Sequence, residues 1–539
     1  MWGLKSKKTI AWIVMLTFLF TCIMPSNIMA GNSIAEAAEP QPVTATGVTV
    51  KLFNYDQRIN SQGLGTKGYK FFHSGAGTAE DGAASSGTYH GQTMPEMKMT
   101  LTADGYPNTA IGSMAYLFNT PAATLLGGGG LFQKDANGYY YYDSGINAAS
   151  YANGRFTLYD YVVRPSYITS DLTDVRIGNF LPFNNAESVT RDRRNESDTA
   201  NGSAVLNGLV DLWFGMSADF EFYMPKDGKM NGQNMVFNFH GDDDVFVYLD
   251  GVLILDIGGT HAAYSGKINF ATGAVQVLND TGGVVYNSTI KDRFVAAGRD
   301  VSTGFNGNTF ADYTLHDFDF FYMERGGNIS YCQLKYNMPV LPENSLTVEK
   351  ELTADPTTPG ELQEVLEQSI NYQFRVLDTD GNVLLANDEF TIKNINDEII
   401  GTDVVGSDGI FELKSGQRAL FTDMIEKTGQ KNYIVQEIIQ DNLTGQYNNI
   451  AYQVNGAGGI TQTDHKAPVG FTGYNTDTLE FDKAQFVRYT NQVDTEELSA
   501  LQITKTIKDA STSSFDINRE FEMQVKFGGE LYRMAPSTV

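Results

Sequence analysis

Residues 346–352 read Leu-Thr-Val-Glu-Lys-Glu-Leu and carry a lysine at a position where the pattern predicts a buried side chain. Apolar residues alternate along this stretch, which is the period of a β-strand with one face in a core. The alternation places Lys350 on the same face as Leu346 and Val348. The stretch therefore predicts a strand that directs a lysine into the core of a β domain.

Two further stretches repeat the pattern with residue types that complement a buried amine. In residues 433–439, Tyr-Ile-Val-Gln-Glu-Ile-Ile, the alternation places Glu437 on the apolar face. In residues 487–491, Val-Arg-Tyr-Thr-Asn, it places Asn491 there. Because an unpaired buried charge is strongly unfavourable, we expect Lys350 and the other two side chains to meet in one core.

Together, these three residue types can form an amide cross-link. A neutral amine that attacks a side-chain amide carbonyl releases ammonia and needs a nearby proton carrier. Burial favours the neutral forms of lysine and glutamic acid, so a buried pair can exchange its proton. We therefore expect Lys350 to join Asn491 with the help of Glu437. The alternative is that Lys350 lies at an exposed strand end and that Asn491 begins a linker.

The length and composition predict a protein of several all-β domains. A chain of 539 residues is too long for one core and suggests about three or four domains. It contains 54 glycines, and only 19% of its residues are charged. Aromatic and β-branched runs recur between Asn, Asp and Gly turns, which is typical of β structure.

The N-terminus predicts export. Three lysines precede an apolar run at residues 10–23, and small residues follow as far as Ala38. This pattern is typical of a secretory signal peptide, assigned to residues 1–38. Cys332 is then the only cysteine of the mature chain, so we expect no internal disulfide and expect any covalent link to use other chemistry.

The charge narrows the classes of partner. The formal net charge is −26, which argues against nucleic acid and anionic membrane as ligands. No second apolar segment has spanning length, so we expect no membrane insertion of the mature chain. The acidity is explained either by solubility or by a role in binding divalent cations.

The first predicted domain covers residues 47–340, after a linker at 39–46. Its clearest element is a hairpin at residues 245–257 that turns at Asp250-Gly251, because Asp-Gly between apolar runs is a strong turn signal. The last strand of this domain is predicted at residues 316–323, where aromatic residues alternate with aspartates.

The second predicted domain covers residues 345–494, with a helix expected at 360–369. An incomplete copy follows at residues 499–539, in which Lys505 repeats the pattern of Lys350 at an offset of 155. No acceptor asparagine follows Lys505, so we expect its amine to stay free and the sequence to be truncated relative to a longer parent.

The three strand motifs at residues 346–350, 433–437 and 487–491 resemble those of isopeptide-forming pilin-type domains. Such domains occur in Gram-positive pilins and adhesins and have an immunoglobulin-like fold of the Cna-B type. The resemblance implies that Lys350 is the nucleophile, Asn491 the acceptor and Glu437 the catalytic acid. In the incomplete copy only the lysine matches.

A second resemblance concerns residues 239–251, Phe-His-Gly-Asp-Asp-Asp-Val-Phe-Val-Tyr-Leu-Asp-Gly, together with residues 255–261 and 320–325. These stretches resemble fibro-slime domains, relatives of the protective-antigen-type lectins. The resemblance implies a large lectin-like jelly-roll sandwich. It also places Asp242 and Asp243 where the lectins hold calcium, and calcium is the one cofactor expected. The alternative is that these aspartates cap the hairpin without a metal.

The predicted function is that of an exported cell-surface adhesin or pilus-type structural protein. A fibro-slime domain would be presented on a stalk locked by the isopeptide bond, with no enzymatic turnover beyond that single reaction. Expected partners are a ligand on a host or neighbouring cell, a glycan among the candidates, and pilus or cell-wall assembly partners. No Leu-Pro-x-Thr-Gly sorting signal is present, so attachment to the cell wall is expected of the longer parent. The alternatives are a calcium-dependent lectin and, less favoured, part of a glycoside hydrolase.

Overall fold

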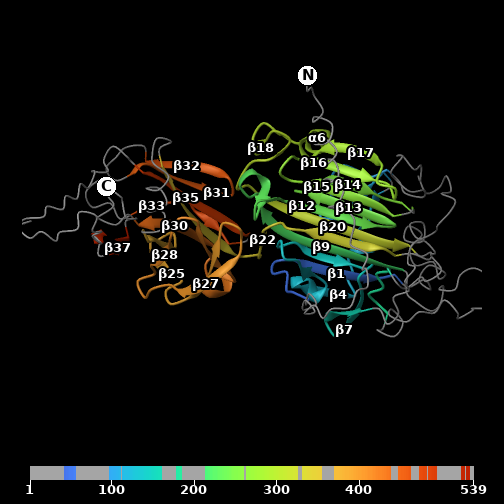
Figure 1. Cartoon of the computed structure of the whole chain (residues 1–539), viewed down its shortest axis with the longest axis horizontal. Helices are drawn as coiled ribbons and strands as arrows, with labels where there is room; N and C mark the ends of the chain where they lie inside the picture. Colours follow the sequence, from blue (N-terminus) through green and yellow to red (C-terminus); the bar gives the residue numbers. More distant parts are fainter. Residues whose placement is uncertain are drawn as a thin grey trace, which may run out of the picture. The chain divides into compact units, whose positions relative to one another are not determined.

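The computed structural model is built mainly from β-strands, which confirms the predicted all-β fold (Figure 1). No helix within the described residues combines the length and the apolarity that a bilayer crossing requires. The structure describes residues 42–55, 96–110, 112–160, 178–184, 213–259, 261, 263–325, 330–354, 370–438, 447–462, 473–481, 483–493, 524–527 and 530–533.

The first sandwich has one sheet in which strands follow the order β14, β13, β20, β9, β1 and β4, with β22 also paired to β9. Its two longest strands lie at the centre and pair along their whole length. The strands are β1 (Thr49–Asn54), β4 (Ala123–Leu126), β9 (Trp213–Tyr223), β13 (Asp244–Leu249), β14 (Val252–Ile257), β20 (Leu315–Arg325) and β22 (Val340–Leu341).

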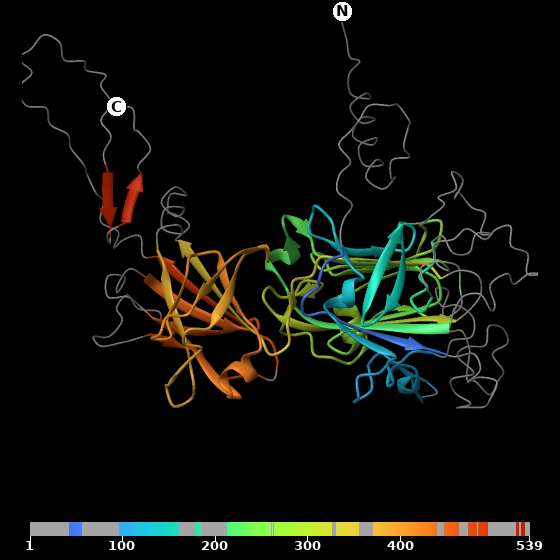
Figure 2. The ribbon, with the colours of Figure 1, turned by 90° about the horizontal axis from the view of Figure 1, so that it is seen from below.

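The opposing sheet follows the order β17, β16, β15, β12, β21, β6 and β5. Figure 2 shows the strands of this sandwich from below. The strands are β5 (Gln133–Lys134), β6 (Tyr140–Asp143), β12 (Val236–Gly241), β15 (Tyr264–Asn269), β16 (Ala274–Leu278), β17 (Val284–Thr289) and β21 (Cys332–Tyr336).

Aromatic side chains fill the space between these two sheets. Phe220 on β9 and Phe318 on β20 stack with ring centroids 4.6 Å apart, and Phe237 on β12 packs against Phe318 at 5.0 Å. Because side chains alternate along a strand, the residues next to Phe220 and Phe318 lie on the other face of the sheet. That outer face is the one that carries aspartates.

The predicted hairpin is confirmed. Strands β13 and β14 pair antiparallel around Asp250 and Gly251, whose φ angles are 49° and 71°. Two consecutive residues with positive φ form the turn type that matches the twist of a hairpin, which is why Asp-Gly occupies it.

The predicted last strand at residues 316–323 exists as β20, but it is not the last strand. Strands β21 and β22 follow it before residue 345. Strand β21 lies between β12 and β6, about 90 residues or more away in sequence. Its existence depends on those distant partners, so its short alternating sequence alone gives little signal.

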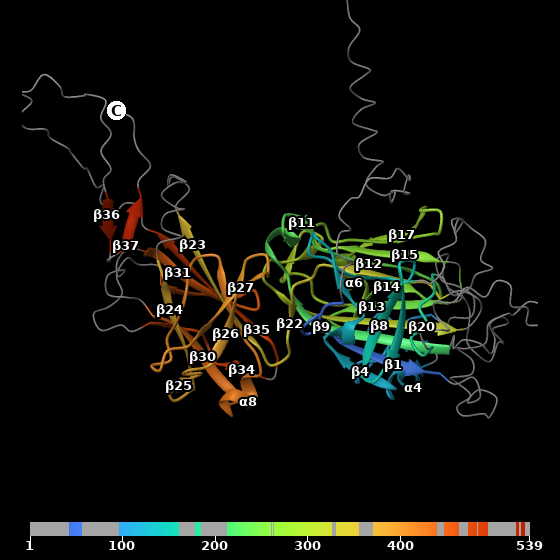
Figure 3. The same cartoon turned by 60° about the horizontal axis from the view of Figure 1, so that its bottom comes forward.

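The second sandwich has a seven-stranded sheet in the order β27, β26, β29, β23, β35, β31 and β32. A smaller sheet has the order β25, β24, β30 and β33, with β28 on β24 and β34 on β30. Figure 3 labels most of these strands. The strands are β23 (Leu346–Ala354), β24 (Tyr372–Leu377), β25 (Val383–Leu384), β26 (Glu389–Asn394), β27 (Ile399–Val404), β28 (Phe411–Leu413), β29 (Gln417–Phe421), β30 (Asn432–Ile438), β31 (Tyr447–Val454), β32 (Ala457–Gln462), β33 (Tyr474–Asn475), β34 (Leu479–Glu480) and β35 (Gln485–Val493).

Short elements complete the described fold. They are the strand pairs β2 (Asn108–Thr109) with β3 (Gly112–Ser113), β7 (Asn147–Ala152) with β8 (Arg155–Asp160), β10 (Lys229–Met230) with β11 (Gln233–Asn234), and β18 (Phe305–Asn306) with β19 (Thr309–Phe310). The helices are α4 (Ala115–Phe118), η2 (Gly127–Gly130), η3 (Lys226–Gly228), α6 (Ile290–Ala296) and α8 (Met424–Thr428).

Side chains of the two sandwiches contact each other. Tyr223 at the end of β9 stacks on Phe486 of β35 with ring centroids 4.6 Å apart. The guanidinium of Arg418 lies over the Tyr223 ring at 4.8 Å, and the Ala484 amide donates to Oε2 of Glu221 at 3.1 Å. Two buried aromatic rings and a buried guanidinium therefore share one contact.

Several predictions fall on residues that the structure does not describe. They concern the signal peptide at 1–38, the helix at 360–369 and Lys505 in the incomplete copy. Of that copy the structure describes a hairpin of two strands, β36 (Gln524–Phe527) and β37 (Glu530–Arg533), which pair with each other. The predicted domain boundaries likewise stay predictions.

Candidate functional site

Strand β23 places Lys350 in the core of the second sandwich. It lies between β29 and β35, and its inward face carries Leu346, Val348 and Lys350, each with no exposed surface. The period-two prediction therefore holds for this lysine. A strand flanked on both sides cannot turn the lysine toward water without breaking the sheet, so the charge must be neutralised inside.

Glu437 and Asn491 approach Lys350 from two other strands. Glu437 lies on β30 in the smaller sheet, and Asn491 lies on β35 beside β23. Lys350 Nζ donates to Glu437 Oε1 at 2.8 Å, and Asn491 Nδ2 donates to the same oxygen at 2.8 Å. All three side chains have no exposed surface. The structure thus brings together the three residues predicted from the sequence.

The register of the parallel strands explains why the side chains meet. Leu352 of β23 lies opposite Asn491 of β35, two positions beyond the Lys350–Tyr489 pair. Lys350 and Asn491 therefore emerge on the same face, one step apart along the sheet. Two acceptor atoms of the trio, Glu437 Oε2 and Asn491 Oδ1, have no hydrogen-bond partner among the described residues. The Glu437 carboxylate can therefore take up a proton on Oε2, and the Asn491 carbonyl can be polarised.

Burial shifts the lysine toward its reactive form. The pKa of Lys350 is lowered to about 8, because desolvation outweighs the opposing attraction of Glu437, and the charge of Arg488 lowers it further. A lysine with a pKa near neutrality has a substantial neutral fraction at physiological pH. The site therefore supplies an amine that can act as a nucleophile.

Aromatic residues enclose the trio, and sequence reasoning did not assign them this role. Lys350 Nζ lies 4.3 Å from the ring centroid of Tyr372 on β24. The Tyr489 hydroxyl donates to the carbonyls of Val435 and Tyr474 at 2.8 and 2.9 Å. The alternation of aromatic and apolar residues from Tyr372 onward is a strand signal, but it does not reveal which ring contacts the lysine.

A second charged group lies behind the same strand, on the face opposite Lys350. Glu349 accepts hydrogen bonds from Arg418 Nε at 2.5 Å and from Arg488 Nε at 2.9 Å. Glu349 and Arg418 are buried, at 3% and 2% exposure. No local sequence pattern indicates this cluster, because its burial depends on Tyr223 and Phe486 at the contact between the sandwiches.

The aspartate loop joins the two sheets of the first sandwich, because it connects β12 to β13. Asp242 and Asp243 are each 6% exposed, and Glu324 on β20 is fully buried. Burial, and then the charge of Asp243, raise the pKa of Asp242 well above its usual value; burial and both aspartates do the same for Glu324. Three acidic groups are thus crowded in an apolar environment.

These side chains do not make a metal cage by themselves. Asp242 Oδ1 accepts from the Tyr331 amide at 2.5 Å, and Asp244 Oδ1 accepts from the Gly259 amide at 2.5 Å. Within the described residues, no group of three or more His, Cys, Asp or Glu side chains is arranged to hold a metal ion. Both hydrogen bonds are of the backbone-capping kind, and calcium at this loop stays a prediction.

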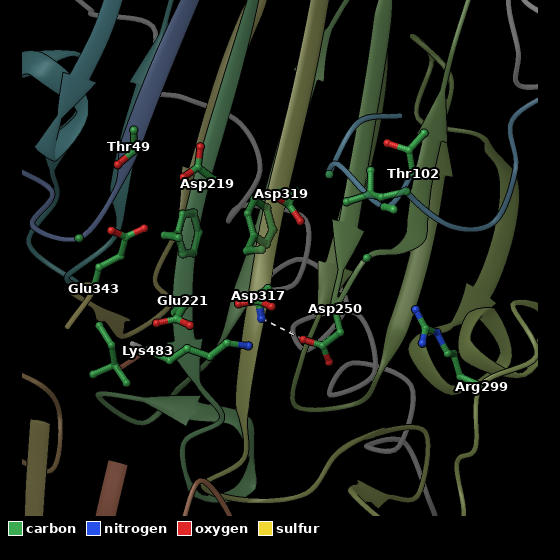
Figure 4. Close-up of a pocket in the computed structure, with 18 residues that line it drawn as sticks. Thr49, Thr102, Asp219, Glu221, Asp250, Arg299, Asp317, Asp319, Glu343 and Lys483 are labelled. Atoms are coloured by element: carbon green, nitrogen blue, oxygen red, sulfur yellow. Dashed lines mark hydrogen bonds between the residues drawn. The ribbon is translucent and has the colours of Figure 1, made fainter. Parts of the chain in front are cut away.

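Carboxylates also line the outer face of β9 and β20 (Figure 4). Asp219 lies directly opposite Asp319, and Glu221 lies directly opposite Asp317. They border a pocket of about 550 Å³ that Asp250, Glu343 and Lys483 also line. Like charges on opposed residues destabilise a strand pair. The described contacts relieve part of this repulsion.

The partial relief comes from two lysines. Lys51 Nζ donates to Asp219 Oδ1 at 2.9 Å, and the charge of Lys483 lowers the pKa of Glu221 and of Asp317 against the rise caused by burial. Asp250, whose Oδ1 accepts from the Asp317 amide at 2.9 Å, adds to the repulsion. The negative charge of Asp319 is not compensated to the same degree. Its pKa is raised to about 7 by burial first and then by Asp219 and Asp317, while Lys51 only partly offsets the shift.

Comparison with known proteins does not place the chain in a family. No protein-family model matches the sequence. The chain is 27% identical to protein psiF of Dictyostelium discoideum over 224 residues, which are 38% of this chain and 25% of psiF. It is 44% identical to protein psiP of the same organism over 71 residues, which are 13% of this chain and 9% of psiP. The chain therefore spans a quarter or less of these relatives.

Solved structures show only slight likeness. The major pilin from Streptococcus pyogenes aligns with 51% of this chain and 98% of its own, at 10% identity and a TM-score of 0.18. A family 2 glycosyl hydrolase from Bacteroides cellulosilyticus aligns with 45% of this chain and 29% of its own, at 8% identity and a TM-score of 0.13. Likeness at this level assigns neither fold nor function.

The raised pKa of Asp319 predicts a pH-dependent stability. Between about pH 4 and pH 7 the folded state retains a proton on Asp319 that the unfolded chain releases, so the free energy of unfolding falls as pH rises through this window. Asp319→Asn, which mimics the protonated acid, should raise the melting temperature at pH 8 and change it little at pH 4. Asp280→Asn, in an exposed turn, is the control. An unchanged pH slope in Asp319→Asn would contradict the assignment.

Proposed function

We propose that the chain is an exported cell-surface structural or adhesive protein whose second sandwich is locked by an isopeptide bond between Lys350 and Asn491. The observation that carries the proposal is the single Glu437 oxygen that accepts hydrogen bonds from both Lys350 Nζ and Asn491 Nδ2 at 2.8 Å. The predicted signal peptide and the lone mature cysteine support an exported protein stabilised by chemistry other than disulfides.

The reaction needs no group beyond the trio. Glu437 accepts one proton from the Lys350 ammonium, and the neutral amine attacks Cγ of Asn491. A second amine proton passes through Glu437 to the departing Nδ2, and ammonia leaves as the new C–N bond forms. The third proton stays on the new amide. Positioning of the groups by three strands supplies the effective concentration that an uncatalysed amide exchange lacks.

The bond would join the first and last strands of the sandwich. Strands β23 and β35 lie side by side and run parallel, and the chain enters the sandwich through β23 and leaves it through β35. A covalent link between them closes a loop of about 140 residues. A pull on the two ends would then pass through the link and leave the remaining strands without load. This is the property required of a stalk that presents a binding domain.

The first sandwich is proposed as the domain that such a stalk presents, with a ligand on a host or neighbouring cell. Pilus or cell-wall assembly partners belong to the same proposal. The single reaction of the trio consumes its own lysine and asparagine, so the proposal assigns the protein no catalytic turnover.

The cross-link predicts a change in mass. The second sandwich of the folded, mature protein should lack the mass of one ammonia, and a tryptic digest should contain a branched peptide that joins Lys350 to Asn491. Glu437→Ala should keep the full mass, because the proton carrier is lost. Intact and peptide mass spectrometry measure both. Glu412→Ala, which removes an exposed glutamate of strand β28 in the same sheet, is the matched control and should still lose ammonia.

An unshifted mass in folded wild-type protein would disprove the cross-link. A cross-link that still forms in Glu437→Ala would remove the role given to that residue, and circular dichroism should first confirm that the variant is folded.

The cross-link also predicts a gain in stability. By the chain-entropy relation used for disulfides, a link that closes about 140 residues stabilises the fold by about 5 kcal/mol. Lys350→Met keeps the side-chain volume but removes the bond, so its second sandwich should melt at a markedly lower temperature in calorimetry. Lys393→Met breaks another nearly buried ion pair, between Lys393 and Asp397 at 3.0 Å, and controls for loss of a charge pair.

The difference in melting temperature between Lys350→Met and Lys393→Met decides whether Lys350 forms a covalent bond or only an ion pair. Equal destabilisation by Lys350→Met and Lys393→Met would mean that Lys350 contributes only an ion pair. The double variant Lys350→Met with Glu437→Leu removes the leftover buried carboxylate, and it should still melt below wild type if the bond is the main source of stability.

A calcium-dependent lectin is the second candidate. The observation in its favour is the crowding of Asp242, Asp243 and Glu324, since a divalent cation would neutralise the charge that raises the pKa of Asp242 and of Glu324. Against it stand the backbone hydrogen bonds that already occupy Asp242 and Asp244.

The calcium proposal has a direct test. If the loop binds calcium, the ion should raise the melting temperature of the first sandwich by mass action, and Asp243→Asn should abolish the rise. Isothermal calorimetry should then report binding, and a glycan array with and without chelator would test the lectin activity. Melting curves that do not change with calcium or chelator would leave the aspartates with a purely structural role.

A further inference from the structure

One edge of the second sandwich is open. Strand β27 ends the order of the seven-stranded sheet and pairs antiparallel with β26 along one side only, and none of the described strands pairs with its other side. Figure 1 labels β27 at the margin of this sandwich. Such an edge offers a row of backbone N–H and C=O groups to an incoming strand.

Apolar side chains are concentrated at this edge. Nine large apolar side chains of the described residues are exposed, and four of them lie in the hairpin of β26 and β27. Their exposures are Ile395 57%, Ile399 70%, Ile400 52% and Val404 53%. Single exposed apolar residues are ordinary, but a group of four on one hairpin marks an interaction surface.

The usual protections of an edge strand are weak in β27. The strand reads Ile-Ile-Gly-Thr-Asp-Val and contains neither lysine nor proline, so its described protection is the register shift at Ile400. Its one charged residue, Asp403, accepts a hydrogen bond from the Val404 amide at 2.8 Å. That amide therefore faces a side chain and not a neighbouring strand. Thr402, two residues earlier, directs its amide to the same side.

The charges around the patch indicate the chemistry of its partner. Exposed carboxylates flank it at Glu389, Glu398, Asp403 and Asp408. The nearby Lys393 is already paired with Asp397, at 3.0 Å. The chain as a whole carries a net charge of −26, so a second copy would be repelled. A basic partner would be attracted to this edge.

We propose that the free edge of β27 binds an extended segment of another protein in which apolar residues alternate with lysine or arginine, and that this segment adds a strand to the sheet. Backbone hydrogen bonds would supply affinity. The apolar residues would pack on the face of Val404, and the basic residues, on the other face, would meet Asp403 and its acidic neighbours. The proposal is independent of the cross-link, because Lys350 lies several strands away in the sheet.

The test uses the mature chain and a fluorescent peptide that alternates valine with lysine over the length of β27. Fluorescence anisotropy measures binding, and hydrogen exchange measures protection of the β27 amides. We expect binding with slower exchange at Thr402 and Val404. A peptide that alternates valine with glutamate, and the lysine peptide N-methylated along one edge, should each bind at least about tenfold more weakly.

Two variants examine the strand itself. Thr402→Pro removes an edge amide, and Val404→Lys places a cation in the patch, so each should reduce peptide binding by at least about tenfold. Val383→Lys, at an exposed valine of β25 in the other sheet, is the matched control and should bind as wild type does. Unchanged melting temperatures will establish that the variants are folded.

Three results would overturn the proposal. The first is equal binding of the lysine and glutamate peptides, and the second is peptide binding that survives both Thr402→Pro and Val404→Lys. The third is a concentration-dependent dimer of the chain alone, seen in sedimentation, with the β27 amides protected. That result would assign the edge to a second copy of this chain.

Discussion

The second sandwich depends on one buried ion pair, between Lys350 and Glu437. Neither group has exposed surface. Among the described residues, their 2.8 Å ion pair is the contact that compensates both charges. Breaking such a pair by removing one partner typically costs about 3–5 kcal/mol, because the other charge remains buried. The native fold thus requires β23 and β30 to be correctly placed in their two sheets before either charge becomes tolerable. The pair therefore favours the one strand register in which the two charges meet.

The two faces of β23 show why only one of its charged residues is poised to react. Glu349, on the opposite face from Lys350, is held by the guanidiniums of Arg418 and Arg488. Arginine does not lose its proton in proteins, so this cluster stays ionic. Lysine can lose its proton, and burial lowers the pKa of Lys350 to about 8. An amide group beside a lysine of this kind turns a structural ion pair into a reactive one.

The sequence was sufficient for the trio because the side-chain period of a strand is two. Once the strands at residues 346–352 and 433–439 were recognised, the faces of Lys350 and Glu437 followed without knowledge of the fold. The hairpin at Asp250-Gly251 was equally local, because Asp-Gly is one of the few dipeptides that favour two consecutive positive φ angles.

Long-range pairing was not accessible in the same way. Strand β21 exists because β12 and β6 flank it, and Asp319 has a raised pKa because register places Asp219 opposite it. The burial of Arg418 depends on Tyr223, 195 residues away in the chain. These features depend on which strands become neighbours, and the strand neighbours cannot be inferred from a single sequence.

The proposed cross-link and the open edge of β27 are physically compatible for a reason that concerns unfolding. An exposed apolar edge promotes aggregation mainly when a domain opens and further strands become available to pair. A bond between β23 and β35 would hold the first and last strands together in any partly unfolded state, and β23 also holds β29 and, through it, β26 and β27 in sequence across the sheet. Opening that exposes additional strands would then become rarer. A sandwich closed in this way could keep isoleucines at one edge for a partner with less risk that an opened domain aggregates through them.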